Sequence, residues 1–327
     1  MPSTVRWGII GPGKIARKFA AGFEKVPHAR LHAIASRDLS RGKEFAKEFN
    51  VPVCYDSYAA LIADPEIDII YIATPHAFHH PQTLQCLRGK KAVLCEKPLT
   101  LDFRKASELV ATARANDTFL MEGMWSRFFP AIRKTVELVR SGAIGEIRFM
   151  RADFGFSAPH DPNNRVLNLA LGGGAQLDVG VYPMFLVLLL MGKPTQVQAT
   201  ARLAATGADE TTAVQFCFQD GGIAHILSSI AADTPKQADI IGTSGTLTLH
   251  TPWHKSEKLT LKHPDGKTDV FDFPFTGFGF DYEVAEVSST ILAGKKESDL
   301  LPLDFSLLMA EVADEILKQS HVVYPAI

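Results

Sequence analysis

A glycine-rich turn between a strand-like and a helix-like segment is the feature that most limits how this chain folds. Residues 5–10 are rich in β-branched and aromatic side chains, as in a strand, and a helical apolar pattern follows the turn. In the turn, Gly11 permits a tight bend, Gly13 lets the backbone approach a pyrophosphate, and Ala16 lets the helix pack closely on the strand. The pattern therefore predicts the first βαβ unit of a dinucleotide-binding domain. The pyrophosphate is expected at the helix N-terminus, beside Lys14 and Ile15.

The end of the next predicted strand, residues 31–37, bears on which nicotinamide cofactor fits. Sites for NAD usually place an acidic residue here to bind the ribose 2′-hydroxyl, whereas this chain has Ser36 and Arg37. A hydroxyl and a guanidinium can bind a 2′-phosphate, which a carboxylate would repel. We therefore favour NADP over NAD. The alternative is that Arg37 is a solvated turn residue and Asp38 takes the acidic role.

Two further strands are expected to deliver polar residues to the same edge of the sheet. Residues 67–73 form a buried strand that leads into Thr74-Pro75-His76, and the turn after such a strand lies beside the nicotinamide ribose. The nearby histidines, His76, His79 and His80, lack a fourth metal ligand at suitable spacing, so we expect no metal site. We predict that the cofactor site is completed by Thr74, Pro75, His76, His79, Glu96 and Lys97.

The strand 92–95 is apolar throughout, as buried parallel strands are, and it stops at Glu96-Lys97-Pro98. Pro98 cannot donate to a sheet and disfavours helical dihedrals at Lys97, so Lys97 is expected on a stiff turn at the carboxyl end of a strand. A lysine at this edge can hold a substrate oxygen and exchange a proton with it. The alternative is an ordinary surface lysine.

The second half carries a pair of polar residues at helical spacing after a run of glycines. Three glycines precede a helix with Asp178 and Tyr182, which are four residues apart and therefore share a helix face. The glycines are expected to let the chain come close to another group, for which the nicotinamide ring is one candidate. A tyrosine titrates near pH 10, so a neighbouring Lys97 ammonium would be needed to lower its pKa. The alternative is a half-buried core tyrosine and a surface aspartate.

Strand patterns dominate from residue 195 to residue 273, with Asp220-Gly221 and Asp265-Gly266 as hairpin turns. The fold class is therefore α/β. We predict a Rossmann doubly wound parallel sheet in residues 1–122 and, in residues 123–327, an α+β domain with a large, mostly antiparallel sheet. The second domain is expected to bind substrate and form dimers, and the C-terminal helix can pack back on the first.

Composition excludes several classes of partner. The formal net charge is −2, which gives no strong field for nucleic acid or a membrane surface. The longest apolar run, residues 181–191, is too short to span a bilayer and contains Pro183. The four cysteines are far apart, without metal-type spacing, as in a cytoplasmic protein with reduced thiols.

With the glycine fingerprint, Thr74-Pro75-His76 and Glu96-Lys97-Pro98 in this order, the chain resembles the glucose–fructose oxidoreductase / inositol dehydrogenase (Gfo/Idh/MocA) family over its whole length. The part from 168 to 182 looks most like its dihydrodiol dehydrogenase and NADP-dependent D-xylose dehydrogenase branch. The resemblance implies Lys97 and Tyr182 as catalytic residues, Asp178 beside them, a cis Lys97–Pro98 bond, and a homodimer through the second domain's sheet. Trp125, Phe154 and Phe280 are candidates for an apolar substrate pocket, although aromatic residues more often fill cores.

The expected activity is transfer of a hydride between the nicotinamide and a secondary alcohol or carbonyl of a small sugar or cyclic diol. One alternative is a lyase or glycoside-cleaving enzyme of the same fold that retains its cofactor. Another is a non-catalytic NADP-sensing regulator.

Overall fold

The computed structural model describes residues 4–159 and 161–325. The chain divides into two compact units. Unit 1 consists of residues 1–125 and 276–307, and unit 2 consists of residues 126–275 and 308–327.

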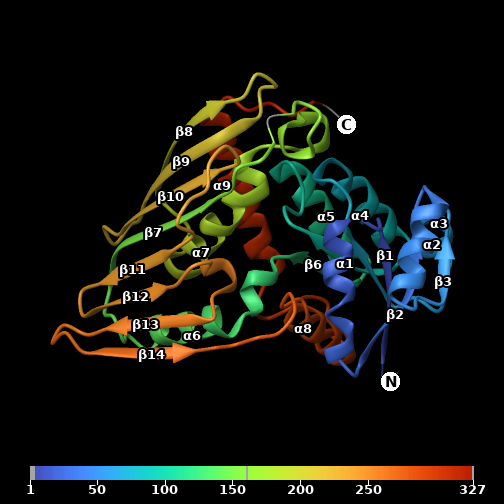
Figure 1. Cartoon of the computed structure of the whole chain (residues 1–327), viewed down its shortest axis with the longest axis horizontal. Helices are drawn as coiled ribbons and strands as arrows, with labels where there is room; N and C mark the ends of the chain where they lie inside the picture. Colours follow the sequence, from blue (N-terminus) through green and yellow to red (C-terminus); the bar gives the residue numbers. More distant parts are fainter. Residues whose placement is uncertain (1–3, 160, 326–327) are drawn as a thin grey trace. The chain divides into compact units, whose positions relative to one another are not determined.

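Unit 1 is built on a parallel sheet of strand order β3-β2-β1-β4-β5-β6 (Figure 1). Its strands are β1 (Val5–Ile10), β2 (Ala29–Ala35), β3 (Val53–Tyr55), β4 (Ile69–Ile72), β5 (Ala92–Glu96) and β6 (Leu120–Gly123). Its helices are α1 (Lys14–Ala20), α2 (Leu39–Glu48), α3 (Tyr58–Ala63), α4 (His79–Arg88), α5 (Phe103–Ala115) and α8 (Asp281–Leu292). The helices α4 and α5 pack against each other, and α8 packs against β1 and β2. The predicted doubly wound parallel sheet is confirmed.

The order of strands reverses between β1 and β4, which pair in parallel through residues 7–10 and 69–72. From this point, the chain continues from β1 to β2, toward the β3 edge of the sheet, and from β4 to β5, toward the β6 edge. In open α/β sheets, a ligand binds outside the carboxyl ends of the strands at such a point. A cofactor site in unit 1 is therefore expected at the turns after β1, β2, β4 and β5.

Unit 2 is built on a second sheet, of order β14-β13-β12-β11-β7-β10-β9-β8, whose only parallel pair among the described residues is β7 with β10. Its strands are β7 (Ile147–Gly155), β8 (Gln196–Leu203), β9 (Asp209–Cys217), β10 (Ile223–Ser229), β11 (Ala238–Gly242), β12 (Gly245–Leu249), β13 (Lys258–Lys262) and β14 (Thr268–Asp272). Its helices are α6 (Pro130–Arg140), α7 (Val181–Met191) and most of α9 (Leu303–Gln319). The predicted mostly antiparallel sheet is confirmed.

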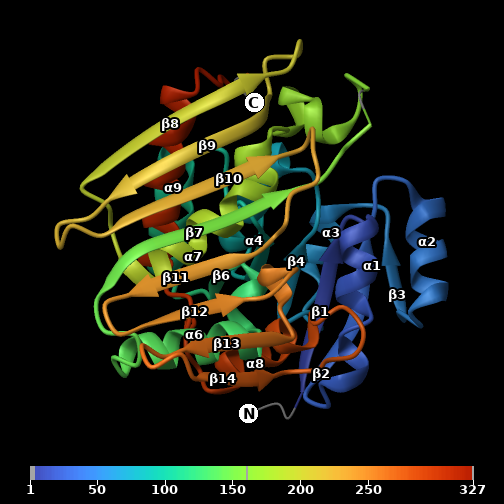
Figure 2. The same cartoon turned by 60° about the vertical axis from the view of Figure 1, so that its left-hand side comes forward.

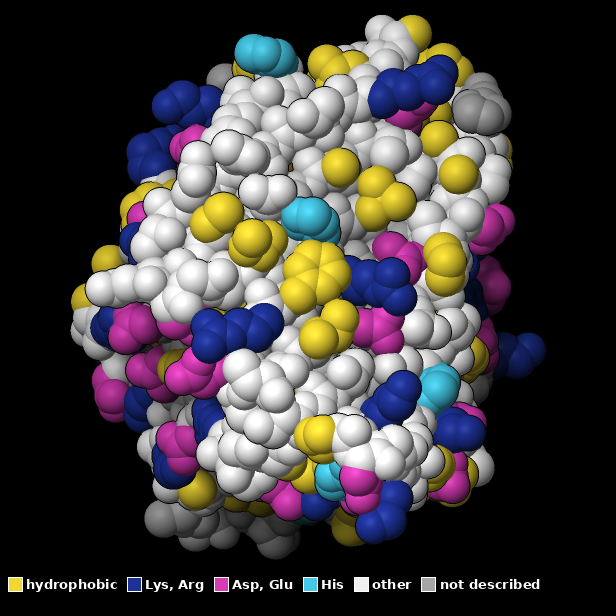
Figure 3. All heavy atoms as spheres, turned by 90° about the vertical axis from the view of Figure 1, so that its left-hand side faces the viewer, with side chains coloured by type: hydrophobic (Ala, Val, Ile, Leu, Met, Phe, Trp, Pro, Cys, Tyr) yellow, Lys and Arg dark blue, Asp and Glu magenta, His cyan; other side chains and the backbone are white. Residues whose placement is uncertain are grey.

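The helices of unit 2 lie on one face of this sheet, and Figures 1 and 2 show the other face uncovered. On that face, Ile223 and Leu227 are each 37% exposed and Val270 is 49% exposed. Figure 3 shows hydrophobic side chains and a histidine near the middle of the face, with charged side chains around them.

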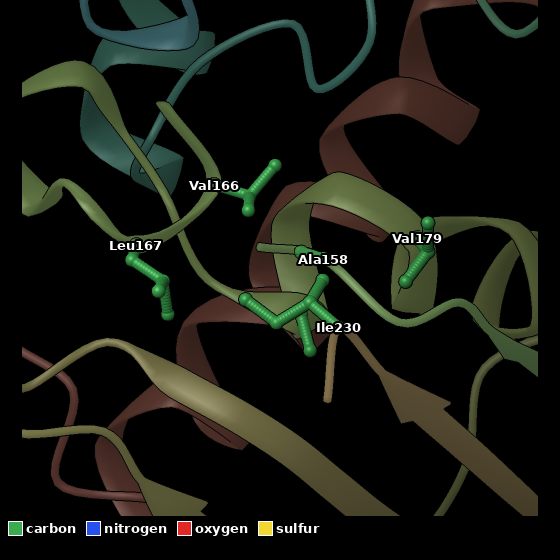
Figure 4. Close-up of a cluster of buried hydrophobic side chains, with 6 residues drawn as sticks. Ala158, Val166, Leu167, Val179 and Ile230 are labelled. Carbon is green, nitrogen blue, oxygen red and sulfur yellow. The ribbon is translucent and has the colours of Figure 1, made fainter. Parts of the chain in front are cut away.

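The helical segment Leu169–Met191 is long and apolar enough to cross a membrane by length and composition alone, but 83% of its most apolar window is buried inside the protein. It therefore serves as a core helix here: α7 packs against β7 and β10. A hydrophobic cluster packs the loop after β7 against the first part of this segment. Figure 4 shows Ala158, Val166, Leu167, Val179 and Ile230 converging there.

Candidate active site

The first turn of unit 1 has the shape that a dinucleotide requires. Gly11 has φ +95°, and a Cβ placed on it would lie 3.0 Å from Thr74 Cγ2 and 3.2 Å from the Ala73 carbonyl oxygen. Glycine is therefore needed both for the backbone conformation and for the close approach to the β4 turn. Gly13 is the extended N-cap of α1 and provides no side-chain cap, and the first turn of that helix has no acidic residue. Backbone N–H groups are thus available for an anion next to the exposed Lys14 and the half-buried Ile15.

The end of β2 places the two predicted phosphate ligands differently. Ser36 is buried, and its Oγ accepts a hydrogen bond from the Asp38 amide at 3.2 Å. Arg37 is exposed, and its guanidinium lies over the ring of Phe78, 5.7 Å from the ring centre. Asp38 caps α2: its Oδ1 accepts from the amides of Ser40 at 3.0 Å and Arg41 at 3.2 Å. A hydrogen bond from the Ser40 hydroxyl lowers the pKa of Asp38 most, and the bonds from the two amides lower it further.

The turn after β4 is tied to the helix that follows. Thr74 Oγ1 donates to Gln82 Oε1 on α4 at 2.6 Å. Pro75 is the extended residue before the short 3₁₀ helix η2 (His76–Phe78), where His76 is buried and lies edge-on to His79 with ring centres 5.6 Å apart. The ring of His79 is itself fully buried.

In the turn after β5, buried carboxyl groups accept hydrogen bonds from the backbone around Lys97. Glu96 is buried, and its side chain accepts from the Tyr71 hydroxyl and, at 3.2 Å, from the Lys97 amide. Burial raises the pKa of Glu96, opposed by the charge of Lys97. One residue past the proline, the Leu99 amide donates to Glu122 Oε1 at 2.9 Å, and burial raises the pKa of Glu122 as well. The Lys97–Pro98 bond is cis, as expected.

In unit 2 the predicted acid/base region begins with an irregular helix. Gln176–Gly180 forms a single π-helical stretch (η6) that runs directly into α7. Such bulges occur frequently at functional sites. Asp178 lies in the bulge, and Tyr182 lies in the first turn of α7. The carboxylate of Asp178 accepts from Arg165 Nη2 at 3.0 Å, and the side chain of Asp178 is 9% exposed.

The three glycines before this helix do approach another group closely. A Cβ on Gly174 would lie 2.2 Å from Asp209 Oδ1, and one on Gly173 would lie 2.7 Å from the Arg165 carbonyl oxygen. Within unit 2, these glycines therefore lie close to other residues of the same chain. Asp209 Oδ2 in turn accepts from the Gln176 amide at 2.7 Å, which fixes the start of the bulge.

Tyr182 packs into an aromatic group that contains the predicted Phe154 and also His254, which was not predicted. Its ring centre lies 5.3 Å from that of Phe154 and 5.7 Å from that of His254. Phe154 and His254 stack with ring centres 4.3 Å apart. His254 is held there because its neighbour Trp253 donates from Nε1 to the Asp153 carbonyl oxygen at 2.7 Å.

The other two aromatic candidates belong to unit 1. Trp125 and Phe280 stack with ring centres 4.7 Å apart, and Phe280 is 2% exposed. The structure therefore groups Trp125 with Phe280, and Phe154 with Tyr182. Among the residues that the structure describes, no group of three or more His, Cys, Asp and Glu side chains is arranged to hold a metal ion.

Comparisons with known proteins agree with this geometry. Residues 5–124 match the family model described as oxidoreductase family, NAD-binding Rossmann fold (GFO_IDH_MocA), and residues 132–248 match the GFO/IDH/MocA C-terminal domain. These matches and the turns of unit 1 define an NAD(P)-dependent oxidoreductase. The chain belongs to the Gfo/Idh/MocA family.

Individual relatives match over nearly the full length. The chain is 37% identical to mouse (Mus musculus) trans-1,2-dihydrobenzene-1,2-diol dehydrogenase, over 98% of both chains. A 3-ketoreductase from Actinomadura kijaniata, solved in complex with NADP and TDP-benzene, is 26% identical with a TM-score of 0.86, covering 97% of this chain and 98% of that one. An aldose–aldose oxidoreductase from Caulobacter crescentus, solved with glycerol, is 25% identical with a TM-score of 0.88 and the same coverage.

Proposed function

We propose that this protein is an NADP-dependent oxidoreductase that transfers a hydride between the nicotinamide and a secondary alcohol or carbonyl carbon of a sugar or cyclic diol. The observation that carries the proposal is the turn after β5. Lys97 lies there at the carboxyl end of a strand next to the switch point, on a backbone held by the buried carboxylates of Glu96 and Glu122. Support for the substrate class comes from relatives named for a cyclic diol and for aldoses.

The residues of unit 1 fit a dinucleotide. Gly11 and Gly13 keep side chains away from the α1 N-terminus, where the pyrophosphate would bind, and Thr74, Pro75 and His76 would border the nicotinamide ribose. When bound, the cofactor supplies or accepts the hydride. The preference for NADP rests on Arg37, which is exposed at the end of β2, and on Asp38, whose carboxylate already caps α2.

The roles of the chain's own groups follow from their chemistry. The Lys97 ammonium would donate a hydrogen bond to the substrate oxygen and favour its negatively charged form. The Tyr182 hydroxyl would take the proton from that oxygen during oxidation and return it during reduction. Asp178, held by Arg165, would accept a hydrogen bond from a substrate hydroxyl or orient the tyrosine.

The test is a substrate panel with the purified protein. Aldoses, trans-cyclic diols and vicinal dicarbonyls are each incubated with NADP(H) and, separately, with NAD(H), and the absorbance of reduced nicotinamide is followed. We expect turnover with one of these classes and a higher kcat/KM with the phosphorylated cofactor. Preference for NAD(H) would contradict the cofactor assignment. A cofactor that survives dialysis and cycles without net change would replace the proposal with the cofactor-retaining lyase.

We propose further that the protein forms a homodimer through the open face of the unit 2 sheet. The support is the exposed apolar side chains of Ile223, Leu227 and Val270, on the face of the sheet opposite the described helices of unit 2. Light scattering after size exclusion should give twice the chain mass, and Leu227→Glu should give the monomer. A monomeric wild-type protein would contradict this arrangement.

We also propose a cytoplasmic location, in keeping with four free cysteines.

A further inference from the structure

The imidazole of His79 lies between two backbone carbonyl groups. Its Nδ1 is 2.7 Å from the Pro98 carbonyl oxygen, and its Nε2 is 2.9 Å from the Thr74 carbonyl oxygen. The side chain is fully buried at the start of α4. Both distances are those of strong hydrogen bonds.

The chemistry of the two partners restricts the protonation of the ring. A carbonyl oxygen only accepts hydrogen bonds, so each ring nitrogen must donate to satisfy its partner. A neutral imidazole carries one N–H, and an imidazolium carries two. Turning the ring over would set C–H groups against the oxygens at less than the usual C–H···O separation of about 3.3–3.6 Å. The two contacts are therefore satisfied together only by the doubly protonated ring.

We propose that His79 is a buried imidazolium that joins the turn after β4 to the turn after β5 and thereby positions Lys97. Pro98, whose carbonyl accepts one of the two bonds, is the residue directly after Lys97. On the other side of the same turn, the Leu99 amide donates to the buried Glu122 carboxylate at 2.9 Å. The imidazolium and the Glu122 side chain thus hold the two sides of the Pro98–Leu99 peptide group.

Burying a cation is costly, and here two charge-assisted hydrogen bonds offset that cost. Other titratable groups on β4, β5 and the segments that follow them include Tyr71, His76, His80, Cys95, Glu96 and Lys97. His76 lies edge-on to the ring, and His80 faces outward to Glu108, with Nε2 3.0 Å from the carboxylate.

The direct test is NMR spectroscopy of the intact protein labelled with 15N in the histidine side chains. At about pH 8, where an ordinary histidine is neutral, His79 is expected to show two protonated ring nitrogens. The signal is assigned by its loss in His79→Gln. Should that variant fail to fold, each of the other ten histidines is replaced by Gln in turn, beginning with His80 and His263, which lie next to carboxylates; an imidazolium signal that persists in all ten variants belongs to His79. Eleven histidines without a persistent imidazolium would overturn the proposal.

The positioning role rests on the proposed function and is tested by kinetics. In His79→Phe, kcat is expected to fall about 10²-fold because Lys97 is displaced. The Kd for NADP should change much less than kcat, and His79→Gln, which retains a donor, should recover part of the rate. The control is His80→Gln on the same helix, with unchanged turnover. Full turnover in His79→Phe would overturn the positioning role. If no substrate of the panel is turned over, the NMR result still decides the charge state.

Discussion

Arg165 and Asp178 form a salt bridge in unit 2, with Arg165 Nη2 3.0 Å from Asp178 Oδ1. The arginine comes from the short 3₁₀ helix η4 (Arg165–Leu167) and is 42% exposed, whereas the aspartate lies in the π-helical stretch and is 9% exposed. The pair thus fixes the direction of a largely buried carboxylate four residues before Tyr182.

Breaking this pair should weaken substrate binding. In Arg165→Met the Asp178 carboxylate loses its partner, and a half-exposed ion pair of this kind is worth about 1 kcal/mol. We expect the KM for substrate to rise about fivefold, with little change in the KM for NADP. Steady-state kinetics measures both. The matched control is Arg202→Met, which breaks the pair of Arg202 with Glu210 at 2.5 Å and should leave both KM values unchanged.

The choice between NADP and NAD should depend on Arg37. Removing a charge-assisted hydrogen bond to a 2′-phosphate costs about 1.5–3 kcal/mol. Arg37→Leu is therefore expected to lower kcat/KM for NADP about 10- to 100-fold and to leave the value for NAD nearly unchanged. Arg41→Leu, an exposed arginine one turn further along α2, provides the comparison and should have a much smaller effect. Equal losses with both cofactors in Arg37→Leu would argue against phosphate recognition at this position.

Tyr182 should be required for proton transfer. The phenylalanine variant keeps the ring that packs on Phe154 and His254 but loses the hydroxyl. We expect kcat to fall about 10²–10⁴-fold. Cofactor affinity, measured by quenching of protein fluorescence, should be unchanged. A Tyr182→Phe enzyme with wild-type turnover would show that another group moves the proton.

Asp209 makes the stability of the protein depend on pH. Burial raises the pKa of Asp209 from 3.8 to about 6, against hydrogen bonds from Thr212 and the Gln176 amide that lower it. Because the folded state favours the protonated acid, this contribution is complete below pH 3.8 and is lost as the pH rises through about 6. The difference amounts to about 3 kcal/mol.

Asp209→Asn removes this titration while keeping an oxygen that can accept from Gln176 and Thr212. Relative to wild type, its free energy of unfolding should therefore rise between about pH 4 and about pH 7. Urea unfolding at a series of pH values measures the change. Asp265→Asn, in an exposed hairpin turn, should not reproduce it. A constant difference between Asp209→Asn and wild type across that range would contradict the raised pKa.

Much of the fold could be predicted because its signals are local. The strand at 5–10 has the predicted bounds, the strand predicted at 92–95 is one residue longer, and Gly221 and Gly266 have positive φ in the expected turns. No local sequence pattern predicts that residues 276–307 belong to unit 1, because this depends on contacts between segments far apart in the chain. The π-helical stretch at Gln176–Gly180 was also not predicted, since periodicity alone does not separate it from the start of α7.

In the candidate site, too, some residues could be predicted from local sequence and others could not. Gly11, Lys97 and Tyr182 were found from short motifs and from the resemblance that those motifs carry. Their partners were not: Arg165 reaches Asp178 across a loop, and His254 stacks on Phe154 from a strand connection 100 residues later. These contacts depend on how distant segments pack, for which a single sequence offers no spacing rule.

The most direct test of the account is the rate of hydride transfer in Lys97→Met, measured together with NADPH binding. We expect kcat/KM to fall about 10²–10⁴-fold while the Kd for NADPH is largely unchanged. The control is Lys91→Met at the opposite end of β5, where the ammonium donates to the Asp64 and Ile67 carbonyl oxygens; it should lose stability but keep turnover. Full turnover in Lys97→Met, with the fold intact, would contradict the central role given to this lysine.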